Sequence, residues 1–194
     1  MLAVSKELYL YWRALKEKRS APERNDVEPG AIRAILADTV MIDFDEPRGF
    51  PLRIAGSNAN ALFLRELRGV SFLDLWRDED REAVKAALRR AADEARPYLL
   101  TARAHPPGLS ALNVEALLLP LRHGGAAHAR LLGSISAEAA PQWLGLIGAG
   151  PISLMSAQPV EAADPGAAAP AGSGDKPPPR PDRPQRAAPT GRRR

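Results

Sequence analysis

The sequence contains no cysteine, and this absence excludes several chemistries. Disulfide bonds, zinc–thiolate sites, iron–sulfur clusters and thiol nucleophiles all require that residue. Long apolar runs are missing as well, so no transmembrane helix is expected. Lys6 and Glu7 fall where a signal peptide needs its apolar segment. We therefore expect a soluble, cytoplasmic protein.

Catalytic and nucleotide-binding motifs are also missing. The sequence has no Walker-type phosphate loop and no G-x-S-x-G nucleophile elbow, and the glycines of "GLIGAGP" stand in the wrong order for a dinucleotide loop. His105, His123 and His128 lie near predicted hairpin loops without the further ligand that a zinc site needs. We expect no metal, no cofactor and no enzymatic activity.

The positive charge is concentrated at the end of the chain. The net charge is +4, but residues 176–194 contain seven Lys or Arg and one Asp, which leaves the remainder with a net charge of −2. Residues 157–194 are rich in Pro, Ala and Gly and lack aromatics, which predicts a disordered tail. The composition of the tail is compatible with three roles. It could bind polyanions weakly, be bound by a partner that recognises polyproline helices, or simply keep the protein soluble. Its basic residues are Lys176, Arg180, Arg183, Arg186, Arg192, Arg193 and Arg194.

An amphipathic helix is predicted within residues 1–20. Ser5 is a suitable N-cap, and Pro22 ends the segment. Large apolar side chains recur at helical spacing on one face, and they need a partner surface. Either the helix docks on its own chain or it forms a homodimer. The residues of this stripe are Leu8, Tyr11, Trp12 and Leu15.

A domain of class α+β is predicted over residues 21–156. Alternating apolar residues predict strands in "TVMIDFD" and "FPLRIAG", and three further strands follow a long amphipathic helix that begins near Asp78. Shorter helices are expected in "EPGAIRAIL" and "SNANALFLREL". Two strands, a helical crossing and three strands form one antiparallel sheet of five strands. Helices should cover one face, and the N-terminal helix part of the other.

Four segments carry a resemblance to a known family. They are "ELYLYWRAL", "APERNDVEPGAIRAIL", "FPLRIAGSNANALFLRELRGVSFLDLW" and "PQWLGL". In this order they resemble small PAS-domain proteins of alphaproteobacteria over about residues 2–154. The resemblance implies a five-stranded sheet with a helical lid and a ligand-sensing or protein-interaction role, without implying a reaction. A flavin-type photoreceptor of this class needs an adduct-forming cysteine, and the chain has none.

The resemblance places a candidate ligand pocket between the lid and the sheet. Its lining residues are core residues by default, and Trp76 is expected to anchor the lid. We expect a stand-alone sensory or regulatory module that contacts an unidentified protein partner and is gated by a small ligand. The alternative is an adaptor that binds nucleic acid or acidic surfaces through the basic tail. The candidate lining residues are Ile54, Leu62, Phe63, Phe72, Trp76 and Leu118.

Overall fold

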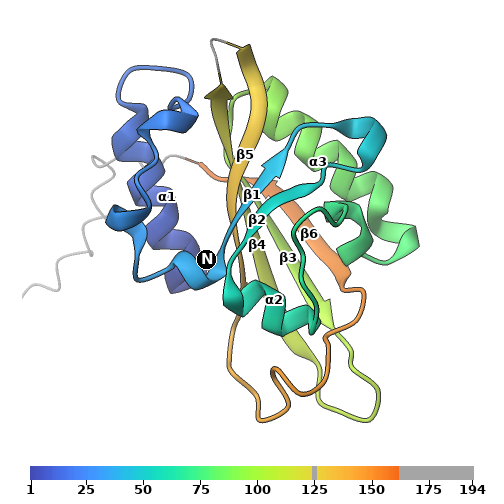
Figure 1. Ribbon diagram of the computed structural model, residues 1–194. Coiled ribbons are helices and arrows are strands. Elements are labelled where there is room, and N and C mark those ends of the chain that lie inside the picture. The colour runs from blue at the N-terminus through green and yellow to red at the C-terminus, as the bar shows by residue number, and fades with distance from the viewer. Residues whose placement is uncertain (124–125, 162–194) are drawn as a thin grey trace, which may run out of the picture. The chain divides into compact units, whose positions relative to one another are not determined.

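The domain is built on one antiparallel sheet with helices on both sides (Figure 1). The computed structural model describes residues 1–123 and 126–161, without the side chains of residues 123–128. The strand order is β2-β1-β5-β4-β3-β6. The strands are β1 (Thr39–Asp43), β2 (Leu52–Ala55), β3 (Tyr98–Ala104), β4 (Leu112–His123), β5 (Ala126–Ala137) and β6 (Ser153–Pro159). The α-helices are α1 (Ala3–Lys16), α2 (Ser57–Phe63) and α3 (Arg81–Asp93), and the short 3₁₀ helices are η1 (Arg24–Asp26), η2 (Pro29–Ile32), η3 (Leu36–Asp38), η4 (Glu46–Arg48), η5 (Phe72–Leu75) and η6 (Asp78–Asp80).

The sheet has six strands, so the prediction of five was one strand short. The additional strand, β6, pairs with β3 from Arg103 opposite Ser153 to Tyr98 opposite Pro159. The amide of Val160 then donates to the carbonyl of Pro97 at 2.8 Å. The segment "SLMSAQP" lacks a clear apolar alternation, and its last three residues fall within the predicted tail. The compact unit extends to Glu161, and the basic residues predicted to form the tail's binding arm lie outside the described part.

The inner face of the sheet is covered by the lid, which consists of α2, η5, η6 and α3. Val40 and Ile42 of β1 point to this face, as their alternation predicts, and Leu100 and Leu118 extend the same surface. Val84, Ala87, Leu88 and Ala91 form the buried stripe of α3. This face holds the larger of the two apolar clusters of the domain.

The outer face of the sheet is covered by α1, on the side opposite to the lid (Figure 1). Leu8 and Trp12 are buried against alternate leucines of β4 and against Leu132 of β5, so the helix docks on its own chain. The indole Nε1 of Trp12 also donates to the carbonyl of Pro120 at 2.8 Å. The stripe is rotated slightly from the predicted one, because Tyr9 is buried while Tyr11 and Leu15 are half-buried.

Ser5 is not the N-cap of this helix. The helix begins at Ala3, and Ser5 lies within its first turns, where it is buried with its Oγ 3.3 Å from the Oγ of Ser134. A small hydroxyl side chain lets the helix approach β5 closely. From the sequence alone, a serine that serves close packing cannot be distinguished from one that caps the helix.

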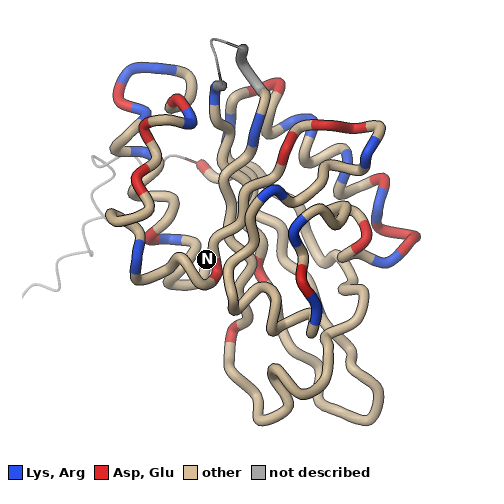
Figure 2. Tube along the Cα trace, viewed as in Figure 1, with Lys and Arg blue, Asp and Glu red and all other residues tan. Residues whose placement is uncertain are grey.

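Charged side chains connect the β1–β2 hairpin to the lid. Glu46 of η4 pairs with Lys85 Nζ at 3.0 Å and with the guanidinium of Arg89, both on α3. The hydrogen bonds from Arg89 and Lys85 hold the pKa of Glu46 below its usual value. Charged residues are frequent around this hairpin and the lid, whereas residues 106–114 and 139–152, in the loops at the lower end of Figure 2, contain none.

Replacing Trp12 tests the docking of α1. We expect Trp12→Ala to lower the free energy of unfolding by about 3–5 kcal/mol, because a large buried aromatic is removed. Chemical denaturation measures the loss, and light scattering measures the mass. If the variant instead stays fully stable and only its mass falls, the helix packs between two chains.

Truncation tests the contribution of β6. A chain that ends at Ile152 lacks β6 and its pairing with β3 but keeps the hydrogen bonds of Ile152 to the lid, and it should melt well below a chain that ends at Glu161, which keeps the strand. Thermal melts of the two truncated forms and the full chain provide the comparison. Equal melting temperatures for the two truncated forms would show that β6 does not stabilise the domain.

Candidate functional site

The lid and the sheet bring five of the six predicted pocket residues into one cluster. The rings of Phe72 and Trp76 pack at a tilt of 57°, with 5.9 Å between their centroids, and Leu62, Phe63 and Leu118 belong to the same buried group. Trp76 is 1% exposed, as an anchor of the lid requires. These side chains therefore fill much of the space in which the sequence placed a ligand.

Ile54 does not belong to this cluster, and its assignment to the pocket was wrong. It is 48% exposed and lies opposite Met41, on the outer side of the sheet. The register between the first two strands shifts between Met41 and Ile42, so that Leu52 pairs with Ile42 while Ile54 pairs with Met41. A bulge of this kind reverses the alternation of side chains along a strand. The sequence alone does not reveal it.

The indole N–H of Trp76 is the chemically distinctive feature of the lid cluster. Its Nε1 is buried and has no hydrogen-bond partner among the described residues. An unpaired buried donor costs about 1–3 kcal/mol. Such a group is a ready donor to a water or to a small ligand with an acceptor atom.

The segment between β5 and β6 closes over the lid. The amide of Ala149 donates to the carbonyl of Leu62 at 2.8 Å, and that of Ile152 to the carbonyl of Leu75 at 2.9 Å. Trp143 and Leu144 of the "PQWLGL" motif pack against the lid cluster. This glycine-rich connection therefore holds α2 and η5 in place, a role that the sequence analysis did not identify.

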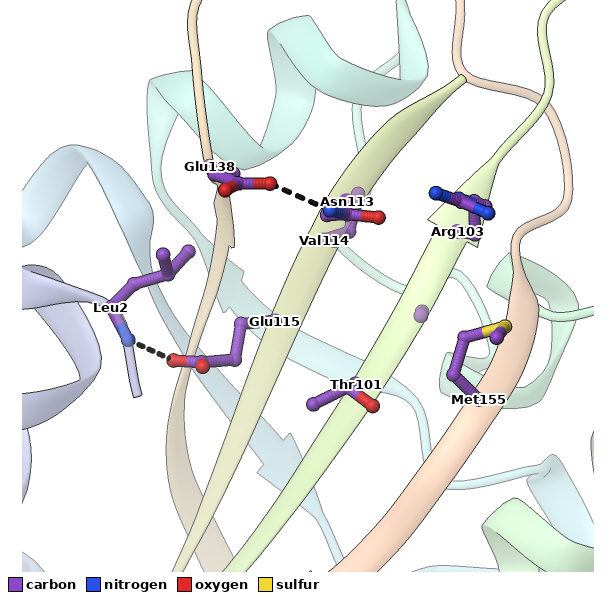
Figure 3. Close-up of a pocket in the computed structure, with 9 residues that line it drawn as sticks. Leu2, Thr101, Arg103, Asn113, Val114, Glu115, Glu138 and Met155 are labelled. Carbon is purple, nitrogen blue, oxygen red and sulfur yellow. Dashed lines mark hydrogen bonds between the residues drawn. The ribbon is translucent and has the colours of Figure 1, made fainter.

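A groove lies on the outer face of the sheet, where the cover provided by α1 ends (Figure 3). Its volume is about 350 Å³. Glu115, 6% exposed, accepts a hydrogen bond from the amide of Leu2 at 2.7 Å. Asn113 Nδ2 donates to Glu138 Oε2 at 2.6 Å on the far side of the groove.

Two side chains of this groove are available to a partner. The guanidinium of Arg103 has no carboxylate within ion-pair distance in the part of the chain that is described. Met155 is 62% exposed on the neighbouring strand β6. A cation, an exposed thioether and several hydrogen-bonding groups on a concave sheet surface suit a protein segment better than a small substrate. This surface was not predictable from the sequence, because β6 lacks the clear apolar alternation of a strand.

Titratable groups do not assemble into a metal site among the described side chains, which are those of residues 1–122 and 129–161. No three His, Asp or Glu residues lie close enough to hold a metal ion in this part of the chain. Burial raises the pKa of Asp38, and the hydrogen bond from Asn58 Nδ2 at 3.0 Å opposes that effect. The side chains of His123 and His128 lie outside the described residues, and His105 is exposed.

Comparison with known families agrees with this geometry. A family model described as PAS domain matches residues 2–136, and the chain therefore belongs to the PAS domain family. A PAS domain is a sensory module, and this chain is one in that general sense. Across the described residues, no helix has the length and hydrophobicity needed to cross a membrane.

Similarity to individual proteins is low. No curated protein matches the sequence at a significant level. The crystal structure of the Rhodobacter sphaeroides LOV protein is similar at 16% identity and a TM-score of 0.43, covering 55% of this chain and 61% of that one. A structure of an RsLOV variant is similar at 18% identity and a TM-score of 0.42, covering 55% and 63%. The chain thus covers about three fifths of each structure.

Replacing Trp76 tests its role as the anchor of the lid. Trp76→Ala should lower the free energy of unfolding by about 3–5 kcal/mol, as expected for a fully buried aromatic. Trp143→Ala is the matched control and should cost less, because Trp143 is only half-buried. Denaturant titration measures both losses. A Trp76 variant as stable as the parent would contradict the burial of this side chain.

Proposed function

We propose that this protein is a sensory or regulatory PAS module that passes its signal to a protein partner through the outer-face groove. The observation that supports this proposal most directly is the open part of the outer face next to α1, where Met155 is exposed and Arg103 has no ion pair among the described residues. The proposal includes no catalytic step, since the described site residues offer no nucleophile with an adjacent base.

The position of Glu115 supports a link between the groove and the N-terminal helix. Its carboxylate lines the groove and also holds the backbone of Leu2, directly before α1. A partner that binds beside Glu115 therefore contacts the group that fixes the start of the helix. Conversely, displacement of α1 alters the groove, because Leu2 is part of its wall.

The lid cluster supports a second element of the proposal, a small ligand that gates the module. The specific observation is the unpaired indole N–H of Trp76. A small molecule with one acceptor atom and an apolar body matches that environment. Its binding would replace a buried, unsatisfied donor with a hydrogen-bonded one, and would thus stabilise the closed lid.

Site-specific photo-crosslinking tests the partner surface. A crosslinking residue at position 103 or 155 should capture a discrete partner in the native host, whereas one at position 79, on the exposed lid side, should not. Met155→Glu should abolish capture from position 103 without changing the melting temperature. Leu10→Glu, which places the same change on the exposed side of α1, should leave capture intact. Capture only from position 79 would assign the partner to the lid instead.

A further inference from the structure

A small apolar cavity lies on the outer face, separate from both the lid cluster and the groove. Its volume is about 80 Å³. The segment between α1 and β1 forms one wall with Val27, Ile32 and Leu36, and the sheet forms the other with Met41, Ile54 and Leu132. A water molecule occupies about 30 Å³ of liquid, so this cavity has room for a short alkyl group.

Arg24 lies at the boundary of this cavity. It lines the cavity and also lines a wider, open groove of about 680 Å³ along β2. Its Nε is buried and has no hydrogen-bond partner among the described residues. Arg122 Nε also lacks a well-formed hydrogen bond, but it has the carboxylate of Glu23 at 3.1 Å, and Arg19 pairs with Asp26 at 2.8 Å. Arg24 differs from both because it has no ion pair among the described residues. A buried nitrogen of a charged guanidinium normally has a hydrogen-bonded anionic partner, and Arg24 has none beside the apolar cavity among the described residues.

The wider groove has an excess of positive charge. Arg48, Arg53 and Arg68 line it together with Arg24, against the carboxylates of Asp43 and Glu66.

Both carboxylates are already engaged. Asp43 is held by Arg130 at 2.9 Å and Arg53 at 3.7 Å. Glu66 accepts from the backbone amide of Arg68 at 3.0 Å and from the side chain of Asn60 at 3.4 Å. Arg48 is paired as well, with Asp45 at 3.8 Å. Arg24 and Arg68 have no ion pair among the described residues, so the groove is complementary to an anion beside these two side chains.

We propose that the cavity and Arg24 together bind a small amphiphilic carboxylate. Its short alkyl group enters the cavity between Ile32 and Leu132, and its carboxylate accepts hydrogen bonds from the guanidinium of Arg24. Charge-assisted pairing of a guanidinium with a carboxylate is strong and geometrically specific. The site lies outside the lid cluster, and it does not depend on the protein partner proposed above.

Occupation of this site has a structural consequence for α1. Val27 and Ile32 also pack in the apolar cluster that holds Leu8 and Trp12. A ligand that fills the cavity supports the segment on which one side of α1 rests. The proposed ligand would thus stabilise the docked state of the helix.

Titration of the isotope-labelled full chain with butanoate, followed by nuclear magnetic resonance, tests the proposal. We expect saturable binding with a Kd of roughly millimolar or tighter, as suits so few ligand atoms. The shifted amides should lie within residues 24–41 and 52–55. Butan-1-ol, which lacks the charge, and acetate, which lacks most of the alkyl group, should each bind about tenfold more weakly or not at all.

Variants separate the site from general effects. Arg24→Gln should weaken butanoate binding about tenfold or more, whereas Arg33→Gln, a nearby exposed arginine outside the cavity, should leave it unchanged. A second pair, Ile54→Asp and Ile54→Asn, differs mainly in charge at the cavity wall. The Asp variant should bind butanoate more weakly than the Asn variant. This comparison tests the proposal even if the Arg24 variant unfolds. Equal binding by the two Ile54 variants, equal binding of butan-1-ol and butanoate, or no saturable shifts would each overturn the proposal.

Discussion

Burial of the central strands on both faces is the constraint on which the rest of the domain depends. Leu117, Leu118 and Leu119 follow one another in β4, and each is 0% exposed. Successive side chains of a strand point to opposite faces, so such a run requires a cover on each side of the sheet. The lid provides one cover, and α1 with the segment that follows it provides the other. The outer-face groove exists because α1 covers only part of its side.

Much of this architecture could be predicted from periodicity. The stripe of α1, the two-residue alternation of β1 and the apolar stripe of α3 are repeated over enough residues to identify each element. The remaining features depend on single residues in tertiary context. A register shift moved Ile54 to the outer face, and Ser5 serves close packing instead of capping. β6 has few large apolar residues, so only its pairing with β3 distinguishes it from the adjoining sequence.

The candidate sites likewise combine features that the sequence predicts with features that only the tertiary structure shows. The lid cluster was predictable as a core, because its members are large apolar residues near the resembling motifs. The unpaired donor of Trp76 was not predictable, because hydrogen-bond satisfaction depends on every neighbouring group. The groove and the cavity beside Arg24 combine residues from distant segments, and no sequence pattern connects them. The wall of the groove includes Leu2, directly before α1, and the wall of the cavity includes the segment after α1. The proposed output of the module and its proposed anionic ligand therefore lie next to opposite ends of the same helix.

Amide hydrogen exchange of the full chain tests most directly the claim that this chain covers both faces of its own sheet. The account predicts that the amides of residues 7–12 in α1 are protected to an extent approaching that of β4, at a protein concentration where the mass is that of a monomer. Unprotected amides in α1 beside a strongly protected β4 would contradict it, because the outer face would then be buried by something other than this helix.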